Sequence, residues 1–170
     1  MAPSVLSVVC RRDAVRLLRL SRTPGGTDIR LGEAMPDAND APADLARLAA
    51  RTALGAGLGA ERLILGLDGG EATLRRLRFP FTARSKIDLV LGPELEPHLP
   101  VPLAETAVSW IRTALEPSPA AVALVAATPL APLTAMREAL GETFSPAPAA
   151  ACLDLAGLDA VLELFAPGGA

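Results

Sequence analysis

The stretch LRRLRFPFTARSKIDLVLGPELEPHLPVPLAE, residues 74–105, concentrates residue types that are scarce in the rest of the chain. It holds the only lysine, Lys86, the only histidine, His98, two of the four phenylalanines and five of the sixteen prolines. The only tryptophan, Trp110, follows shortly afterwards. Such a cluster marks either a catalytic site or a structural feature, and the surrounding sequence has to decide between them.

The composition indicates a folded globular protein. The chain has 170 residues, of which 51% are hydrophobic, so it can form one large domain or two small ones that share a core. A net charge of −3 without a long basic run argues against nucleic acid as a partner. No apolar stretch approaches the roughly twenty residues that cross a bilayer, so we expect no direct membrane insertion and no signal peptide.

The two cysteines, Cys10 and Cys152, are far apart and lie in apolar surroundings. This pattern predicts buried thiols in a reducing compartment, not a disulfide or a metal site.

Outward from the opening stretch, the pattern predicts alternating strands and helices. Three short β runs form an expected meander, and Asp40 is expected to cap the helix that follows, with Pro42 in its first turn. The three strands of the meander cover residues 4–9, 14–21 and 27–34. Further strands are expected over residues 62–67, 72–79, 105–115, 120–127 and 148–155. A helix is expected directly after the all-apolar strand 120–127, and another over 157–165.

Asp68, Gly69 and Gly70 separate two of these strands. The triplet favours a tight hairpin turn, because glycine tolerates positive φ. A phosphate loop is the alternative, but the lysine and hydroxyl residues of a P-loop are missing and a strand follows instead of a helix.

Inside the opening stretch, Thr82 is expected to cap a second helix, and Pro93 to kink or divide it. Its apolar stripe comprises Ile87, Val90, Leu91 and Leu95. Phe79, Phe81 and Leu99 are expected to pin its ends to a sheet, so the cluster is interpreted as architecture.

Two short motifs in this stretch resemble the type II secretion protein L family and the related pilus protein PilM. In that family an R-x-L-x-x-P strand end precedes a helix, and an E-x-E-x-x-L-P turn follows it. The motifs stand here as Arg75, Leu77 and Pro80, and as Glu94, Glu96, Leu99 and Pro100. The order of strands and helices along most of the chain is also similar to that family.

The resemblance implies a mixed α/β, ribonuclease H-like or actin-like ATPase fold, of which this chain supplies the first half. Residues 1–80 would form the first part of the actin-like subdomain, residues 81–118 a small inserted subdomain, and residues 119–170 the returning strand–helix units.

The resemblance further implies a role without catalysis. Proteins of this kind lie on the cytoplasmic side of the bacterial inner membrane, with a membrane helix downstream in the secretion family. They link the secretion ATPase to other inner-membrane platform subunits. Self-association of the fragment is expected if the missing half normally covers the strand 120–127.

We expect that this half of the actin-like fold has lost the residues that bind nucleotide. Actin-like ATPases open with an acidic residue in the first strand and a glycine-rich turn, whereas this chain has VLSVVCRRDAVRLL, with only Asp13, in the turn. Glu94 and Glu96 point to different sides of a helix, and one histidine with two distant cysteines makes neither a triad nor a zinc site. We therefore expect no catalytic residues, no metal site and no cofactor.

The charged residues of the second helix region offer a docking surface, namely Arg84, Lys86, Asp88, Glu94 and Glu96. An ordinary solvated helix face is the alternative for the same residues. For the whole protein, the alternatives are an actin-like ATPase or sugar-kinase-like enzyme with its catalytic loops in the missing half, and an unrelated α/β binding domain.

Overall fold

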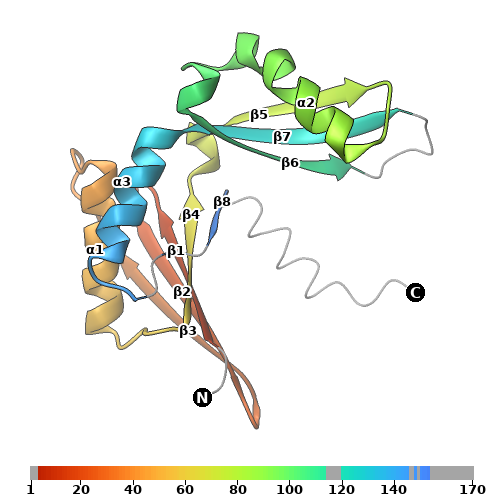
Figure 1. Cartoon of the computed structure of the whole chain (residues 1–170). Coiled ribbons are helices and arrows are strands. Elements are labelled where there is room, and N and C mark those ends of the chain that lie inside the picture. The colour runs from red at the N-terminus through yellow and green to blue at the C-terminus, as the bar shows by residue number, and fades with distance from the viewer. Residues whose placement is uncertain (1–3, 114–119, 146–147, 149, 154–170) are drawn as a thin grey trace. The chain divides into compact units, whose positions relative to one another are not determined.

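The computed structural model describes residues 4–113, 120–145, 148 and 150–153. The chain divides into two compact units, each with its own β-sheet. The large unit comprises residues 1–69 and 132–170, and the small unit comprises residues 70–131. The two can be followed in Figure 1 by colour, since the small unit runs from yellow-green to cyan.

The large unit is built on a five-stranded sheet with the order β3-β2-β1-β4-β8. Its strands are β1 (Ser4–Cys10), β2 (Val15–Thr23), β3 (Gly26–Ala34), β4 (Arg62–Leu67) and β8 (Ala150–Leu153). β1, β2 and β3 are consecutive antiparallel neighbours, while β4 is parallel to both β1 and β8. The expected three-strand meander and the last short strand are confirmed.

Two helices, α1 (Pro42–Gly55) and α3 (Leu130–Gly141), pack on the same side of this sheet (Figure 1). Strand residues Leu6, Val8 and Leu17 form one cluster with Leu45 of α1 and Leu140 of α3. The buried side of α1 is mostly alanine, which lets the helix lie close to the sheet. Its buried residues are Leu45, Ala46, Ala49, Ala50 and Ala53.

The start of α1 differs from the expectation. The N-cap residue is Ala41, not Asp40, and Pro42 occupies the first helical position. The backbone N–H of Ala41 donates to Oδ2 of Asp44 at 3.3 Å, while Oδ2 of Asp40 accepts from the backbone N–H of Asp37 at 3.0 Å. Asp44 therefore caps the helix from inside its first turn, and Asp40 closes the preceding loop.

The end of α1 is a Schellman motif. Gly57 has φ +63°, a conformation that glycine adopts without a Cβ clash. Its N–H donates to the carbonyl oxygen of Leu54 at 3.1 Å, and the N–H of Leu58 donates to that of Ala53 at 2.8 Å. Gly57 is therefore the residue whose left-handed conformation ends α1.

The expected hairpin at Asp68, Gly69 and Gly70 is wrong. β4 belongs to the five-stranded sheet, whereas β5 (Thr73–Phe79) belongs to a separate three-stranded sheet. A short 3₁₀ turn over Gly69–Glu71 connects them, and the positive-φ residues of the described chain are Gly26 and Gly57. Two glycines in sequence thus suggested a tight reversal where the chain passes from one sheet to another.

The small unit consists of a three-stranded antiparallel sheet, order β5-β7-β6, covered on one side by α2 (Arg84–Leu95) (Figure 1). β6 spans Thr106–Thr113 and β7 spans Ala121–Pro129. Its core joins Ile87, Leu91 and Leu95 of α2 to Phe79 and Val125 of the sheet, with Val90, Phe81 and Leu99 packed against it. The apolar stripe of the helix and the pinning residues are confirmed.

Two details of α2 correct the expectation. Its N-cap is Ala83 instead of Thr82, and the helix runs from Arg84 to Leu95 across Pro93 without dividing. The other expected effect of Pro93, a kink, stays a prediction. The C-terminal extension is a 3₁₀ turn, Glu96–His98.

The apolar strand expected over residues 120–127 is β7, the central strand of this sheet. Ala121, Ala123, Val125 and Ala127 are buried, whereas Leu124 on the opposite face is 38% exposed.

Because β5 and β7 both pair within the sheet that contains β6, the small unit spans residues 70–131 and is wider than the segment 81–118. The helix expected over 157–165 lies outside the described residues.

Candidate functional site

The turn between β1 and β2 lies at the carboxyl end of β1, beside the end of the parallel strand β4. Arg11 organises this turn. Its backbone N–H donates to the carbonyl oxygen of Ala14 at 3.1 Å, and its Nε donates to Oδ1 of Asp13 at 2.9 Å. The same Nε lies 4.0 Å from Oδ2 of Asp68, which follows β4.

The electrostatics of this turn follow from that contact. The hydrogen bond from Arg11, helped by the charges of Arg11 and Arg16, lowers the pKa of Asp13, whose side chain is exposed. The turn contains no glycine and no residue with positive φ, so it lacks the backbone conformation of a glycine-rich phosphate loop. The side chains that it presents include the Arg11–Asp13 ion pair.

Cys10, the last residue of β1, is buried with 2% exposure. Burial raises the pKa of its thiol to about 12, so the sulfur stays protonated and non-nucleophilic near neutral pH. The expected buried thiol is confirmed for Cys10, while the side chain of Cys152 lies outside the described residues.

The small unit carries a hollow between α2 and β6, with a volume of about 370 Å³. Nε1 of Trp110 donates a hydrogen bond to Oδ1 of Asp88 at 2.8 Å, and Cζ of Arg84 lies 5.3 Å from the centroid of the indole ring. Arg84 and Asp88 are one helical turn apart and so face the same way. The lining of the hollow comprises Arg84, Asp88, Leu91, Gly92, Leu103, Val108, Ser109 and Trp110.

The structure thus brings together two of the five residues expected at a docking surface. Arg84 and Asp88 meet at Trp110, whereas Lys86, Glu94 and Glu96 are exposed elsewhere on α2 and on the turn that follows it. Lys86 is two positions from both Arg84 and Asp88, which places it on another side of the helix. The sequence did not show that Trp110 would join this set, because its partner Asp88 is 22 positions away.

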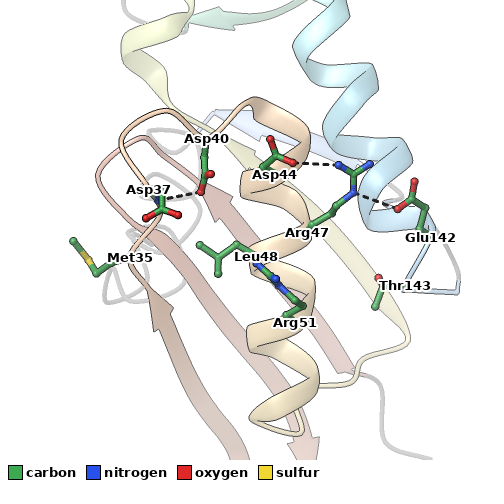
Figure 2. Close-up of a pocket in the computed structure, with 9 residues that line it drawn as sticks. All are labelled: Met35, Asp37, Asp40, Asp44, Arg47, Leu48, Arg51, Glu142 and Thr143. Carbon is green, nitrogen blue, oxygen red and sulfur yellow. Dashed lines mark hydrogen bonds and ion pairs between the residues drawn. The ribbon is translucent and has the colours of Figure 1, made fainter.

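A larger hollow, of about 450 Å³, lies in the large unit between α1, the loop before it and the residues after α3 (Figure 2). Arg47 links its two sides, with NH1 3.2 Å from Oδ1 of Asp44 and Nε 3.5 Å from Oε2 of Glu142. Figure 2 shows Asp37 and Asp40 on the loop and Arg51 further along α1. The sequence pattern did not indicate this hollow, since its two sides come from residues 35–51 and 142–143.

Both acidic and basic side chains line the larger hollow. Asp37, Asp40 and Asp44 recur every three or four residues, which was the one signal available in the sequence. Within the part of the chain that the structure describes, no group of three or more histidine, cysteine or acidic side chains is arranged to hold a metal ion. Arg47 instead bridges the carboxylates of Asp44 and Glu142.

Comparison with known proteins gives a fold. No protein-family model matches the chain, and no curated protein matches it. Among solved structures, a chain of the PilM–PilN type IV pilus biogenesis complex superposes with a TM-score of 0.68 at 18% identity, over 95% of this chain and 51% of that one.

Two further structures agree. The cytoplasmic domain of EpsL, an inner-membrane component of the type II secretion system of Vibrio cholerae, matches with a TM-score of 0.56 at 12% identity, over 82% of this chain and 53% of that one. A Bacteroides thetaiotaomicron protein of unknown function with an actin-like ATPase fold matches with a TM-score of 0.52 at 10% identity, over 96% and 56%.

These likenesses establish the fold class. The chain has the mixed α/β, actin-like ATPase fold that the motifs implied, and it spans about half the length of the solved chains it matches. Among the described residues, no helix is both long and apolar enough to cross a membrane.

Proposed function

We propose that this chain is a non-catalytic assembly component of a bacterial type II secretion or type IV pilus-like machine. It acts on the cytoplasmic side of the inner membrane and recruits the secretion ATPase to the membrane platform. Two of the matched structures carry names from these two machines, which supports the proposal at the level of the fold.

The observation that carries the non-catalytic part is the turn between β1 and β2. Within an actin-like fold this turn would have to hold phosphate and a metal ion, and here Arg11 pairs with Asp13 across a glycine-free turn. The turn offers a triphosphate no glycine-made amide cradle, and its one carboxylate is paired with Arg11. The arrangement favours binding of protein partners over nucleotide turnover.

The proposed docking site is the hollow around Trp110. Tryptophan and arginine are among the residue types that most often carry binding energy in protein interfaces. Here Arg84 lies over the ring of Trp110, beside the apolar Leu91, Leu103 and Val108. Because Asp88 holds the indole by a hydrogen bond, the ring is ordered before a partner arrives, which lowers the entropic cost of binding. A stable contact would need roughly 800 Å² from this chain, so the hollow serves as its centre.

Co-purification with the cognate secretion ATPase tests the proposal. Charge reversal of the pair that faces Trp110, Arg84→Glu with Asp88→Arg, is expected to abolish capture. The matched control reverses an exposed pair of the same helix, Lys86→Glu with Glu94→Arg, and is expected to leave capture unchanged. Equal capture by both variants would remove the Trp110 hollow as the docking site, and no capture by the unmodified protein would reject the ATPase as partner.

An actin-like ATPase or sugar-kinase-like enzyme is the competing proposal. It is favoured by the fold and by the chain spanning about half of the matched structures, which leaves room for catalytic loops elsewhere. Titration calorimetry with ATP and magnesium on the full-length protein distinguishes the two. Micromolar binding that is lost on changing Arg11 or Asp13 would favour the enzyme.

A further inference from the structure

β3 is the end strand of the five-stranded sheet, and among the described residues no strand pairs with its outer edge. It is nine residues long and mostly exposed. Ile29 is 53% exposed and Leu31 is 76% exposed. A long edge strand with exposed apolar side chains is a template for pairing with another strand, which proteins otherwise block with charge, proline or a covering element.

The side chains of β3 divide between the two faces of the sheet. Gly32 lies opposite Leu17 on the face covered by α1, where an added methyl group would approach Leu58 to 3.1 Å. Because side chains alternate along a strand, Asp28 and Arg30 share that face with Gly32, and Ile29 and Leu31 lie on the other.

On that other face, the apolar side chains of β3 continue a stripe from the neighbouring strand. Ile29 lies opposite Leu20 and Leu31 lies opposite Leu18 in the β2–β3 register. Both leucines are half-buried, whereas the two β3 residues at the margin are exposed. The stripe therefore ends at the free edge, where a further strand would cover it.

Geometry restricts how a second copy of the chain can pair there in an antiparallel way. Along a strand, the backbone N–H and C=O groups of alternate residues point to opposite edges. Two residues that lie opposite each other in an antiparallel pair both point toward the other strand or both point away from it. In two copies of the same strand, opposite residues are therefore both odd-numbered or both even-numbered. The register that centres on Arg30 sets two guanidinium groups opposite each other. The register that centres on Ile29 sets Asp28 of each copy opposite Arg30 of the other, with Ile29 facing Ile29.

We propose that two copies of this chain pair through their β3 edges, antiparallel, with Ile29 on the two-fold axis. The charges support this register, because opposite charges directly across a strand pair stabilise it and like charges destabilise it. Within one chain, Oδ2 of Asp28 lies 3.1 Å from Nε of Arg30 and 3.4 Å from NH1 of Arg19. The side chains of Asp28 and Arg30 are 36% and 57% exposed, so in the dimer each would exchange or share this intrachain contact with the matching residue of the second copy. This pairing is independent of the proposed docking function.

One strand edge with two apolar side chains buries less than the roughly 800 Å² per partner of a standard interface. The expected dimer is therefore weak, with a micromolar dissociation constant, and the second copy must be tested at high protein concentration.

Disulfide crosslinking tests the register directly. In a Cys152→Ala background, Ile29→Cys is expected to give a crosslinked dimer under mild oxidation, because the two sulfurs meet at the axis. The matched control is Leu31→Cys on the same strand and the same face. In the proposed register its two copies lie four residues apart along the strand, about 14 Å, which is beyond the reach of a disulfide.

The expected result is crosslinking of Ile29→Cys at least tenfold faster than of Leu31→Cys. The buried Cys10, whose pKa is raised, does not compete with an exposed thiol. Crosslinking of Leu31→Cys as fast as Ile29→Cys, or no crosslinking of Ile29→Cys, would overturn the proposal.

Charge exchange gives a second, independent test by sedimentation equilibrium. Arg30→Asp places the new carboxylate of each copy opposite Asp28 of the other copy. This repulsion occurs twice per dimer and is expected to raise the dissociation constant about tenfold. Asp28→Arg is expected to act likewise, and the double exchange to restore the original value. A double exchange that stays monomeric while its circular dichroism and melting temperature are unchanged, or an unmodified protein that is monomeric at about 100 µM, would refute the pairing.

Discussion

Nε1 of Trp110, on β6, donates a hydrogen bond to Oδ1 of Asp88, on α2, across a distance of 2.8 Å. This contact joins the helix of the small unit to its sheet at the edge of the hollow, and Arg84 lies over the same indole ring. The three side chains make the helix face and the strand one continuous surface. The change in the free energy of unfolding when these side chains are replaced therefore measures how strongly they hold the proposed docking site together.

The Trp110–Asp88 hydrogen bond is expected to contribute about 1 kcal/mol to the free energy of unfolding. A double-mutant cycle of Trp110→Phe and Asp88→Ala measures this coupling by urea unfolding followed with circular dichroism, and it cancels changes in helix propensity. The control cycle replaces Asp88→Ala by Glu94→Ala, which is exposed on the same helix. Similar coupling in both cycles would mean that the hydrogen bond has no specific energetic role.

Gly57→Ala is expected to destabilise the large unit by about 1 kcal/mol or more, because the φ of +63° forces the new Cβ toward the following carbonyl. Gly55→Ala is the matched control, since Gly55 ends α1 without positive φ and has open space where a Cβ would go. Helix propensity predicts that this variant is stabilised by about 0.5 to 1 kcal/mol. Opposite signs in thermal unfolding are the expected outcome, and equal effects would contradict the Schellman end.

Gly66→Ala is expected to destabilise the five-stranded sheet by about 1 to 3 kcal/mol through overpacking. A methyl group at Gly66 would lie 2.7 Å from Cγ2 of Val9 and 3.4 Å from the carbonyl oxygen of Val8. Val9 is β-branched and cannot easily rotate away. Val9→Ala combined with Gly66→Ala should therefore cost less than the sum of the single variants in denaturant unfolding, whereas strict additivity would place the clash elsewhere.

The pKa of Cys10 makes stability fall at alkaline pH. Burial raises the pKa of the thiol from 9.0 to about 12, so the folded state holds its proton where the unfolded chain releases it. The stabilisation is fully present below about pH 8 and is lost as the pH rises toward 12, with a slope of at most about 1.4 kcal/mol per pH unit.

Cys10→Ala should remove this slope between pH 9 and about pH 11, although it lowers stability at every pH by losing packing. The measurement is the free energy of unfolding of both proteins across that range. Parallel pH profiles would show that another group causes the alkaline loss.

Most of the local structure could be predicted because it depends on neighbouring residues. The alternation in SVLSVVC and VRLLRL, the prolines around α2 and the glycines after α1 act within a few positions of the chain. Two motifs around Arg75 and Glu94 sufficed to indicate the actin-like fold, which the solved structures confirm. The helix caps were misplaced by one residue, since the N-cap residues Ala41 and Ala83 have no side-chain acceptor, and at α1 the side chain of Asp44 caps from inside the first turn.

What only the tertiary structure decided concerns residues that are distant in the chain. Asp68, Gly69 and Gly70 suggested a hairpin, yet β4 and β5 belong to different sheets, because strand pairing is chosen by burial against whole neighbouring elements. In the same way, the tertiary structure brings Asp88 to Trp110 and Arg47 to Glu142, and it places β3 at the edge of its sheet. The sequence by itself determined the elements and their buried faces through local periodicity, while the sites depend on long-range packing that no local pattern encodes.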